Sequence, residues 1–306
     1  MNTLITGGSG LVGSAMKGWP NHTLFAPTKQ EMNLMNIDDI IKFIEKNEID
    51  SVIHCAARVG GVKENAENPA DFFYDNTMMT MNIIEASRRT GIKKVVCMLS
   101  TCVFPKDSTY PITVDQIHNG EPHPSNYGYG YAKRMTEVNA RAYRDQYDMN
   151  IVNIIPCNIY GPNDNFNTNS GHVIPCLIHK CYLAKQNNTD FEIWGTGRPY
   201  REFLYSEDVA NISRWVLENY DDDEPLIVSP DEEINIAILA QHIAHRMDFG
   251  GSIVYNQELD GMFRKPSDNS KFKSLLPDYK FVPIEEGLQN TIDWFIENYN
   301  TGNVRL

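Results

Sequence analysis

Short apolar runs rich in β-branched residues alternate with longer amphipathic segments through the first half of the chain. The apolar runs predict strands at residues 2–6, 22–26, 51–55, 94–100 and 150–157. The segments between them repeat apolar residues at helical spacing, which predicts helices at 11–18, 37–47, 69–90 and 129–147. This alternation is typical of parallel strands joined by crossover helices. We therefore expect an α/β fold built on a doubly wound parallel sheet.

The pattern changes after residue 166, where Pro, Asn and Gly become frequent. Helices are predicted at 172–185, 206–220 and 285–299, and a strand at 191–194. We expect a smaller C-terminal α/β domain for substrate binding, formed by 161–201 and 231–306. Residues 1–160, joined again by about 202–230, would then form the larger, nucleotide-binding domain.

Composition and charge narrow the class of protein. The chain has 306 residues, 42% of them hydrophobic and 22% charged, which is typical of a folded globular protein. Its net charge of −13 argues against a nucleic-acid or anionic-membrane partner, because such partners need a basic surface. No signal peptide or long apolar run is evident, so we expect a cytoplasmic protein that does not bind membranes. The six cysteines include no CxxC pair, so neither a metal site nor a disulfide is predicted.

The segment TGGSGLVG directly follows the first predicted strand and spaces its glycines as GxxGxxG. Glycine permits a tight turn and a close approach of the backbone to a diphosphate, and a helix start after the turn would supply amide donors. This context predicts a Rossmann-type dinucleotide site. Its residues are Gly7, Gly8, Ser9, Gly10, Leu11, Val12 and Gly13.

The end of the second strand bears on the choice between NAD and NADP. An NAD site would place an acid there to bind the ribose 2′-hydroxyl, whereas this chain has Thr28 and Lys29, which suit a 2′-phosphate. NADP(H) is therefore favoured as the cofactor. Glu31 argues the other way, because it would occupy the ribose position if the strand ended later.

Tyr129 and Lys133 form a YxxxK pair on one face of a predicted helix. A phenol is a poor acid or base at neutral pH, but a neighbouring ammonium stabilises its phenolate. Ser100, at the end of a central strand, would hold a carbonyl oxygen at the edge where parallel sheets bind ligands. Together these residues predict carbonyl reduction by a nicotinamide cofactor.

The glycine turn, Ser100 and the YxxxK pair resemble, in type and order, the signature of the extended short-chain dehydrogenase/reductase family. Further segments are similar to family members that epimerise GDP-4-keto-6-deoxy-D-mannose at C3 and C5 and then reduce it at C4. These segments are 56–62, 68–76, 99–105, 125–135, 160–175 and 194–205. The resemblance covers nearly the whole chain and implies a GDP-sugar substrate.

Inversion of a carbon centre requires a base on one face of the sugar and an acid on the other. The resemblance assigns Cys102 as the base and His172 as the acid. In an extended strand Ser100 and Cys102 would share one face, so both could serve one pocket. Positive charge nearby would favour the thiolate, and His172, Lys133 and the oxidised nicotinamide are its expected sources.

The resemblance also implies binding residues and an assembly. Substrate contacts fall on Lys180, Trp194, Arg201 and Asp260. A homodimer would pack through the helices at 69–90 and 129–147. Beyond the glycine turn, the implied cofactor contacts are Lys29, Asn33, Leu34, Leu99, Lys133, Pro156, Cys157, Asn158, Ile159 and His172.

Other functions remain open at the level of the sequence. A 4-epimerase would need no Cys–His pair, whereas an epimerase/reductase or 4-ketoreductase acting on another GDP-sugar would share most of these motifs. An inactive NADP-binding protein would have no chemical need for Tyr129 and Lys133. Cys102 and His172 could also be a buried thiol and a histidine satisfied by local hydrogen bonds.

Overall fold

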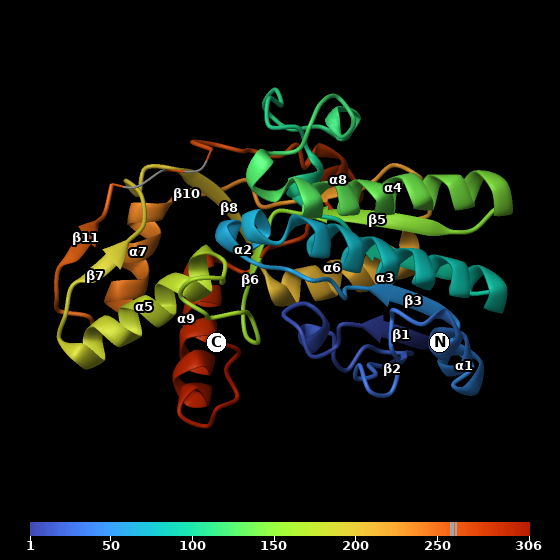
Figure 1. Ribbon diagram of the computed structural model, residues 1–306, viewed down its shortest axis with the longest axis horizontal. Helices are drawn as coiled ribbons and strands as arrows, with labels where there is room; N and C mark the ends of the chain where they lie inside the picture. Colours follow the sequence, from blue (N-terminus) through green and yellow to red (C-terminus); the bar gives the residue numbers. More distant parts are fainter. Residues whose placement is uncertain (258–259, 261) are drawn as a thin grey trace.

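Six parallel strands form the central sheet of the computed structural model, which describes residues 1–257, 260 and 262–306 (Figure 1). Their order across the sheet is β2-β1-β3-β4-β5-β9. The strands are β1 (Asn2–Thr6), β2 (Thr23–Phe25), β3 (Ser51–His54), β4 (Lys94–Met98), β5 (Ile151–Pro156) and β9 (Leu226–Val228). The predicted doubly wound α/β fold is confirmed.

The strand order places a topological switch between β1 and β3. From β1 the chain passes outward to β2, and it then returns to the other side of β1 as β3. Open parallel sheets bind ligands in the crevice at such a point, outside the carboxyl ends of the strands. The loops after β1 and β3 are therefore the first place to look for a site.

Alternation of side chains along each strand gives the sheet two apolar faces. Leu4, Val52 and Val95 pack with α1 (Ile37–Lys46), α3 (Pro69–Thr90) and α4 (Tyr127–Tyr147). Their neighbours Ile5, Ile53 and Val96 pack on the other face with α6 (Ser206–Asn219). Both faces are covered, as nearly continuous apolar strands require.

A second cluster of elements carries a separate apolar core, in which Phe166, Phe191, Ile178, Leu239 and Phe295 are buried. Its helices are α5 (Val173–Asn187), α7 (Ile236–Arg246) and α9 (Ile284–Tyr299). A three-stranded sheet has the order β10-β8-β6, from β6 (Asn158–Tyr160), β8 (Tyr200–Tyr205) and β10 (Glu233–Asn235). A two-stranded sheet pairs β7 (Phe191–Ile193) with β11 (Ile253–Tyr255).

Short elements complete the described chain. They are the helices α2 (Val62–Glu67) and α8 (Ser270–Leu275) and the 3-10 turns η1 (Gly13–Ala15), η2 (Thr101–Val103), η3 (Val114–Gln116) and η4 (Pro124–Asn126). Across the described part of the chain, no helix combines the length and apolar character needed to cross a membrane.

Two local predictions are wrong. The helix expected at 11–18 is only the 3-10 turn η1, so the glycine turn is not followed by a full α-helix. The strand expected at 94–100 ends at Met98, and the chain then turns into η2. The strand patterns did not indicate β6, β8, β9, β10 or β11, because most of these strands have only three residues.

Candidate active site

The glycine turn lies at the switch point between β1 and β3. Its backbone is packed so closely that only glycine fits at Gly7 and Gly13. Gly7 has φ +72°, and a Cβ added there would lie 2.9 Å from the Ala56 backbone in the loop after β3. A Cβ on Gly13 would lie within 2.4 Å of the Gly7 carbonyl oxygen, which itself accepts from the Gly10 N–H at 2.9 Å. A Cβ on Gly10 would lie 3.3 Å from the same Gly7 carbonyl oxygen. Ser9, Leu11 and Val12 complete a turn that fits a dinucleotide diphosphate.

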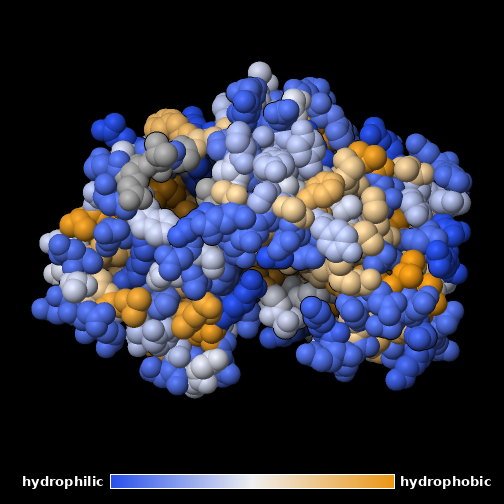
Figure 2. All heavy atoms as spheres, viewed as in Figure 1, coloured by the Kyte–Doolittle hydropathy of each residue, from blue (hydrophilic) through white to orange (hydrophobic). Residues whose placement is uncertain are grey.

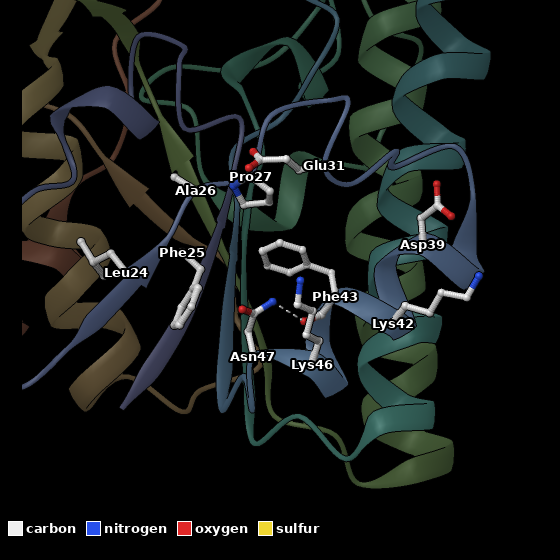
Figure 3. A pocket seen from close by; sticks show the side chains of 10 residues that line it. All are labelled: Leu24, Phe25, Ala26, Pro27, Glu31, Asp39, Lys42, Phe43, Lys46 and Asn47. Atoms are coloured by element: carbon white, nitrogen blue, oxygen red, sulfur yellow. Dashed lines mark hydrogen bonds between the residues drawn. The ribbon is translucent and has the colours of Figure 1, made fainter.

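Glu31, the acid that argued against NADP, lies in the turn after β2. Glu31 Oε2 accepts hydrogen bonds from the Thr28 N–H at 2.8 Å and from the Thr28 hydroxyl at 2.9 Å. The backbone hydrogen bond, followed by the hydroxyl, lowers the pKa of Glu31. Figure 3 shows Glu31 above Pro27 at the rim of a pocket between β2 and α1. Its carboxylate is thus engaged with its own turn, while Lys29 is exposed.

The segment after this turn is tied to its surroundings. Asn33 Oδ1 accepts from the Met35 N–H at 3.1 Å, and the Leu34 carbonyl accepts from the Asn82 amide of α3 at 2.9 Å. Hydrogen bonds therefore hold both of these predicted cofactor residues in place.

Ser100 ends the central strand differently from the sequence prediction. Its hydroxyl accepts from the Cys102 N–H at 3.2 Å and caps η2. A serine that satisfies a free amide favours a helical turn over continued extension. The argument that Ser100 and Cys102 share one strand face is therefore wrong. The two residues are nevertheless adjacent, because the capping contact joins them directly.

The YGYGYAK segment begins α4 and brings the YxxxK pair close to the strand ends. A Cβ on Gly130 would lie 2.8 Å from the Cys102 carbonyl oxygen, and one on Gly128 would lie 2.3 Å from that of Pro69. These two glycines let α4 approach both η2 and α3. Lys133 Nζ donates to the Met98 carbonyl at 2.7 Å and lies 5.8 Å from the centre of the Tyr129 ring.

Desolvation dominates the titration of this pair. It raises the pKa of the partly buried Tyr129 phenol, and the nearby Cys102 adds to the rise, while a hydrogen bond with Ser100 opposes it. Desolvation also lowers the pKa of Lys133 to about 8. The direction for Tyr129 is opposite to the sequence expectation, because desolvation and the neighbouring Cys102 outweigh the hydrogen bond with Ser100. The phenol therefore keeps its proton at neutral pH.

Cys102 differs from most of the other cysteines in its exposure and its contacts. Cys97, Cys157, Cys176 and Cys181 are buried, whereas Cys102 is partly exposed. Asn126 Nδ2 donates to the Cys102 sulfur at 3.1 Å. This thiol therefore has both access to solvent and a hydrogen-bond donor.

Lys265 adds positive charge beside the thiol. Its Nζ donates to the Thr101 carbonyl at 2.6 Å. Burial lowers the pKa of Lys265, and the neighbouring Cys102 works against that shift. Sequence analysis identified neither Asn126 nor Lys265. Asn126 stands three residues before Tyr129, which is a usable signal, whereas Lys265 has no motif.

His172 precedes α5 in a loop that reaches the same edge of the sheet. The Gly61 N–H, after β3, donates to the Ser170 carbonyl at 2.6 Å and holds this loop beside the switch point. The His172 side chain is exposed by 49%. Desolvation lowers its pKa, but hydrogen bonding and charge from Asp164 outweigh that cost, and the net shift is upward.

The remaining predicted cofactor residues lie at the ends of β4 and β5. Leu99 donates its N–H to the Ile154 carbonyl at 2.8 Å, and Cys157 donates its N–H to Val228 at 3.0 Å. Asn158 donates from its side chain to the Glu202 carbonyl at 2.8 Å. Residues 156–159 are thus held by hydrogen bonds to β9 and β8.

The predicted substrate residues lie in the second cluster of elements. Lys180 Nζ lies 3.9 Å from the centre of the Trp194 ring. Asp260 accepts from the Thr196 N–H at 2.9 Å and from its hydroxyl at 2.6 Å. Burial lowers the pKa of Arg201, and the charge of Asp260 opposes the shift. The positive charge of Arg201 also lowers the pKa of Lys265, the lysine whose pKa the Cys102 thiol raises.

Comparisons with known proteins identify the family of the chain. A family model described as the NAD dependent epimerase/dehydratase family matches residues 3–237. A Dictyostelium discoideum protein described as GDP-L-fucose synthase is 43% identical over 307 residues, covering 97% of this chain and 96% of its own. A Drosophila melanogaster protein described as a probable GDP-L-fucose synthase is 39% identical, covering 97% and 98%.

A solved structure shares the fold over the full length of this chain. The crystal structure of a GDP-L-fucose synthetase from Naegleria fowleri bound to NADP superposes with a TM-score of 0.93. It is 38% identical and covers 100% of this chain and 96% of its own. The similarity therefore includes both the central sheet and the second cluster of elements.

Proposed function

Because the chain belongs to the NAD dependent epimerase/dehydratase family, among its GDP-L-fucose synthases, we propose that it converts GDP-4-keto-6-deoxy-D-mannose to GDP-L-fucose. The reaction inverts C3 and C5 and then reduces C4 with NADPH. The observation that carries this proposal is the partly exposed Cys102 thiol beside the Ser100, Tyr129 and Lys133 group. A simple 4-reductase has no use for such a thiol.

The chain's own residues fit the cofactor. The glycine turn permits a diphosphate to approach its backbone closely, and the exposed Lys29 suits a 2′-phosphate. NADPH bound there supplies the hydride for C4. The other predicted contacts are Asn33, Leu34, Leu99, Lys133, Pro156 to Ile159 and His172.

Epimerisation needs acidic protons and two side chains on opposite faces of the sugar. The C4 ketone acidifies the protons at C3 and C5, and Cys102 removes each of them as a thiolate. The Asn126 amide and the Lys265 ammonium favour that thiolate by hydrogen bonding and charge. His172 returns a proton from the other face, which inverts the centre.

Reduction uses the second set of residues. Tyr129, which keeps its proton at neutral pH, donates it to the C4 oxygen. Ser100 holds the oxygen, and the Lys133 ammonium stabilises the phenolate that remains. Lys180, Trp194, Arg201 and Asp260 bind the GDP-sugar.

The direct test supplies the 4-keto sugar nucleotide with NADPH, follows NADPH absorbance and determines product stereochemistry by NMR. We expect oxidation of NADPH and inversion at both carbons. Absence of oxidation would reject the proposal. Product formed only from a related GDP-sugar, or with uninverted centres, would instead support the alternative reductases.

Two variants separate the chemistries. Cys102→Ser should lower proton–deuterium exchange at C3 and C5 by about 10²- to 10⁴-fold while some reduction of the unepimerised ketone remains. Tyr129→Phe should lower reduction by a similar factor and spare exchange. Cys181→Ser, at a buried thiol of α5, and Tyr131→Phe, two residues from Tyr129, are controls of the same residue types. Equal loss of both steps in either variant would contradict separate roles.

A homodimer through α3 and α4 is also proposed. The two helices lie side by side, and apolar side chains gather over them on the face drawn in Figure 2. Phe73, Tyr74 and Met81 of α3 are exposed by 41%, 58% and 41%, and Tyr147 of α4 by 44%. Sedimentation equilibrium should give twice the chain mass, and Met81→Lys should shift it toward the monomer.

Two expectations from the sequence stay predictions. One is the cytoplasmic location. The other is the division into a nucleotide-binding domain of 1–160 with 202–230 and a substrate domain of 161–201 with 231–306.

A further inference from the structure

Asp164 is a buried carboxylate beneath the loop that carries His172. It is 5% exposed, and its Oδ1 accepts from the Asn165 N–H at 2.7 Å. Its other oxygen, Oδ2, is buried without a hydrogen-bond partner among the described residues. Burying a carboxylate is costly unless a positive group compensates its charge.

The group available for that purpose is the His172 ring. His172 Nδ1 lies 3.8 Å from Asp164 Oδ1. Because Nδ1 faces the carboxylate, Nε2 is the nitrogen left on the other side of the ring. A carboxylate at this position favours the imidazolium and keeps the proton on Nδ1 after Nε2 has given its own away.

A second charge opposes the first. Arg305 lies on the C-terminal segment, where its carbonyl accepts from the Phe166 N–H at 2.8 Å and its backbone pairs with Asn165. The guanidinium of Arg305 disfavours the imidazolium. Other charged residues on the packed elements are Glu64, near the Gly61 contact, and Lys180 on α5. Only Asp164 and Arg305 are resolved as acting on the ring among the described residues.

We propose that Asp164 is a positioning residue that holds His172 as an imidazolium with Nε2 presented as the proton donor. This inference rests on the proposed function of His172 as the epimerisation acid. In the step itself, the Nε2–H bond breaks, a C–H bond forms at C3 or C5, and the ring is left neutral with its proton on Nδ1. The carboxylate does not take up the proton.

The direction in which the pH dependence of inversion shifts follows from the role of His172 as an acid. An acid works below its pKa, so inversion is lost as pH rises through the pKa of His172. Removing the Asp164 charge lowers that pKa and moves the loss of inversion to lower pH. Removing the Arg305 charge raises it and moves the loss to higher pH. Reduction of C4 takes its proton from Tyr129 and not from His172, so its pH profile should move much less.

The first experiment titrates the full-length protein without substrate. The His172 ring signal is assigned by its absence from the His172→Gln spectrum and is followed by NMR against pH in wild type, Asp164→Asn and Arg305→Gln. We expect the midpoint to move down in Asp164→Asn and up in Arg305→Gln. An unmoved or raised midpoint in Asp164→Asn overturns the proposal. If Asp164→Asn does not fold, the wild-type midpoint decides, because a value at or below the ordinary histidine value of 6.5 overturns the proposal.

The second experiment follows product stereochemistry and deuterium incorporation in the same variants. At pH 8 we expect Asp164→Asn to lose about tenfold or more of inversion, within the range a general acid contributes, while C4 reduction is retained. Equal loss of inversion and reduction overturns the positioning role. Failure of the wild type to turn over the sugar nucleotide would reject the proposed function instead, and the substrate-free titration would still test the Asp164 contact.

Discussion

Asn126 donates a hydrogen bond from Nδ2 to the sulfur of Cys102 across 3.1 Å. Asn126 ends η4, directly before the helix that carries Tyr129 and Lys133. The thiol assigned to epimerisation is thus held by the element that leads into the reductase pair.

Replacing this amide should affect one step more than the other. A thiolate gains stability from an N–H donor, so Asn126→Ala should slow exchange at C3 and C5 by about tenfold, the equivalent of one charge-assisted hydrogen bond. Reduction of C4 should change much less. The exchange rate is measured by NMR in deuterium oxide, and unchanged exchange would remove Asn126 from the mechanism. Asn169→Ala, in an exposed loop, is the control.

The pH profile of reduction should have an alkaline limb set by Lys133. Burial lowers the pKa of Lys133 to about 8, and its ammonium is present only below that value. The raised pKa of Tyr129 keeps the proton donor intact over the same range. We therefore expect kcat/KM for C4 reduction to fall as pH rises through about 8. A profile that is flat through this region would contradict the assignment.

Glu202 offers a prediction about stability. It is 4% exposed, and burial raises its pKa from 4.5 to about 7, although hydrogen bonds from Ser267 oppose the rise. Between these values the folded protein holds a proton that the unfolded chain has lost, so the free energy of unfolding falls as pH rises. At pH 8, Glu202→Gln should therefore raise that free energy, by about 3 kcal/mol at most.

Thermal denaturation of Glu202→Gln at two pH values checks this sign. The gain should be present at pH 8 and absent at pH 4, where both states are protonated. Glu297→Gln, on the exposed side of α9, should show no such difference. Stabilisation of equal size at both pH values would point to packing instead of charge.

Gly130 should resist substitution because the backbone of η2 lies against it. A Cβ would meet the Cys102 carbonyl oxygen and the Pro122 side chain, each at 2.8 Å. Overpacking of this kind costs about 1–3 kcal/mol. We expect Gly130→Ala to lower the unfolding free energy by this amount and to impair both exchange and reduction. Gly250→Ala, where a Cβ would meet nothing within 4 Å, should do neither.

The sheet and the chemistry at its edge were largely predictable from local patterns. The runs that became β1, β3, β4 and β5 are continuous and apolar, and the helices α3 and α4 have long amphipathic repeats. The glycine turn and the YxxxK pair could be identified because their chemistry requires fixed spacing between near neighbours in the chain.

Contacts between distant segments were not predictable. Lys265 reaches the Thr101 carbonyl across 164 positions of sequence, and no local spacing encodes that approach. The end of β4 was misplaced because Ser100 favours a cap as readily as a strand, and only its contact with the Cys102 N–H decides between them. The raised pKa of Tyr129 also required the structure, since desolvation depends on what covers the ring.

The arrangement of Lys180 and Trp194 allows ligand binding to be followed by tryptophan fluorescence. The Lys180 ammonium lies 3.9 Å from the centre of the indole ring, and 47% of Trp194 is exposed. Indole emission responds to a nearby charge and to a stacked nucleobase, so a ligand that takes the place of the ammonium will change its intensity. Substrate affinity can then be followed by fluorescence in variants that no longer turn over, with Trp194→Phe as the reference for the emission of the other three tryptophans.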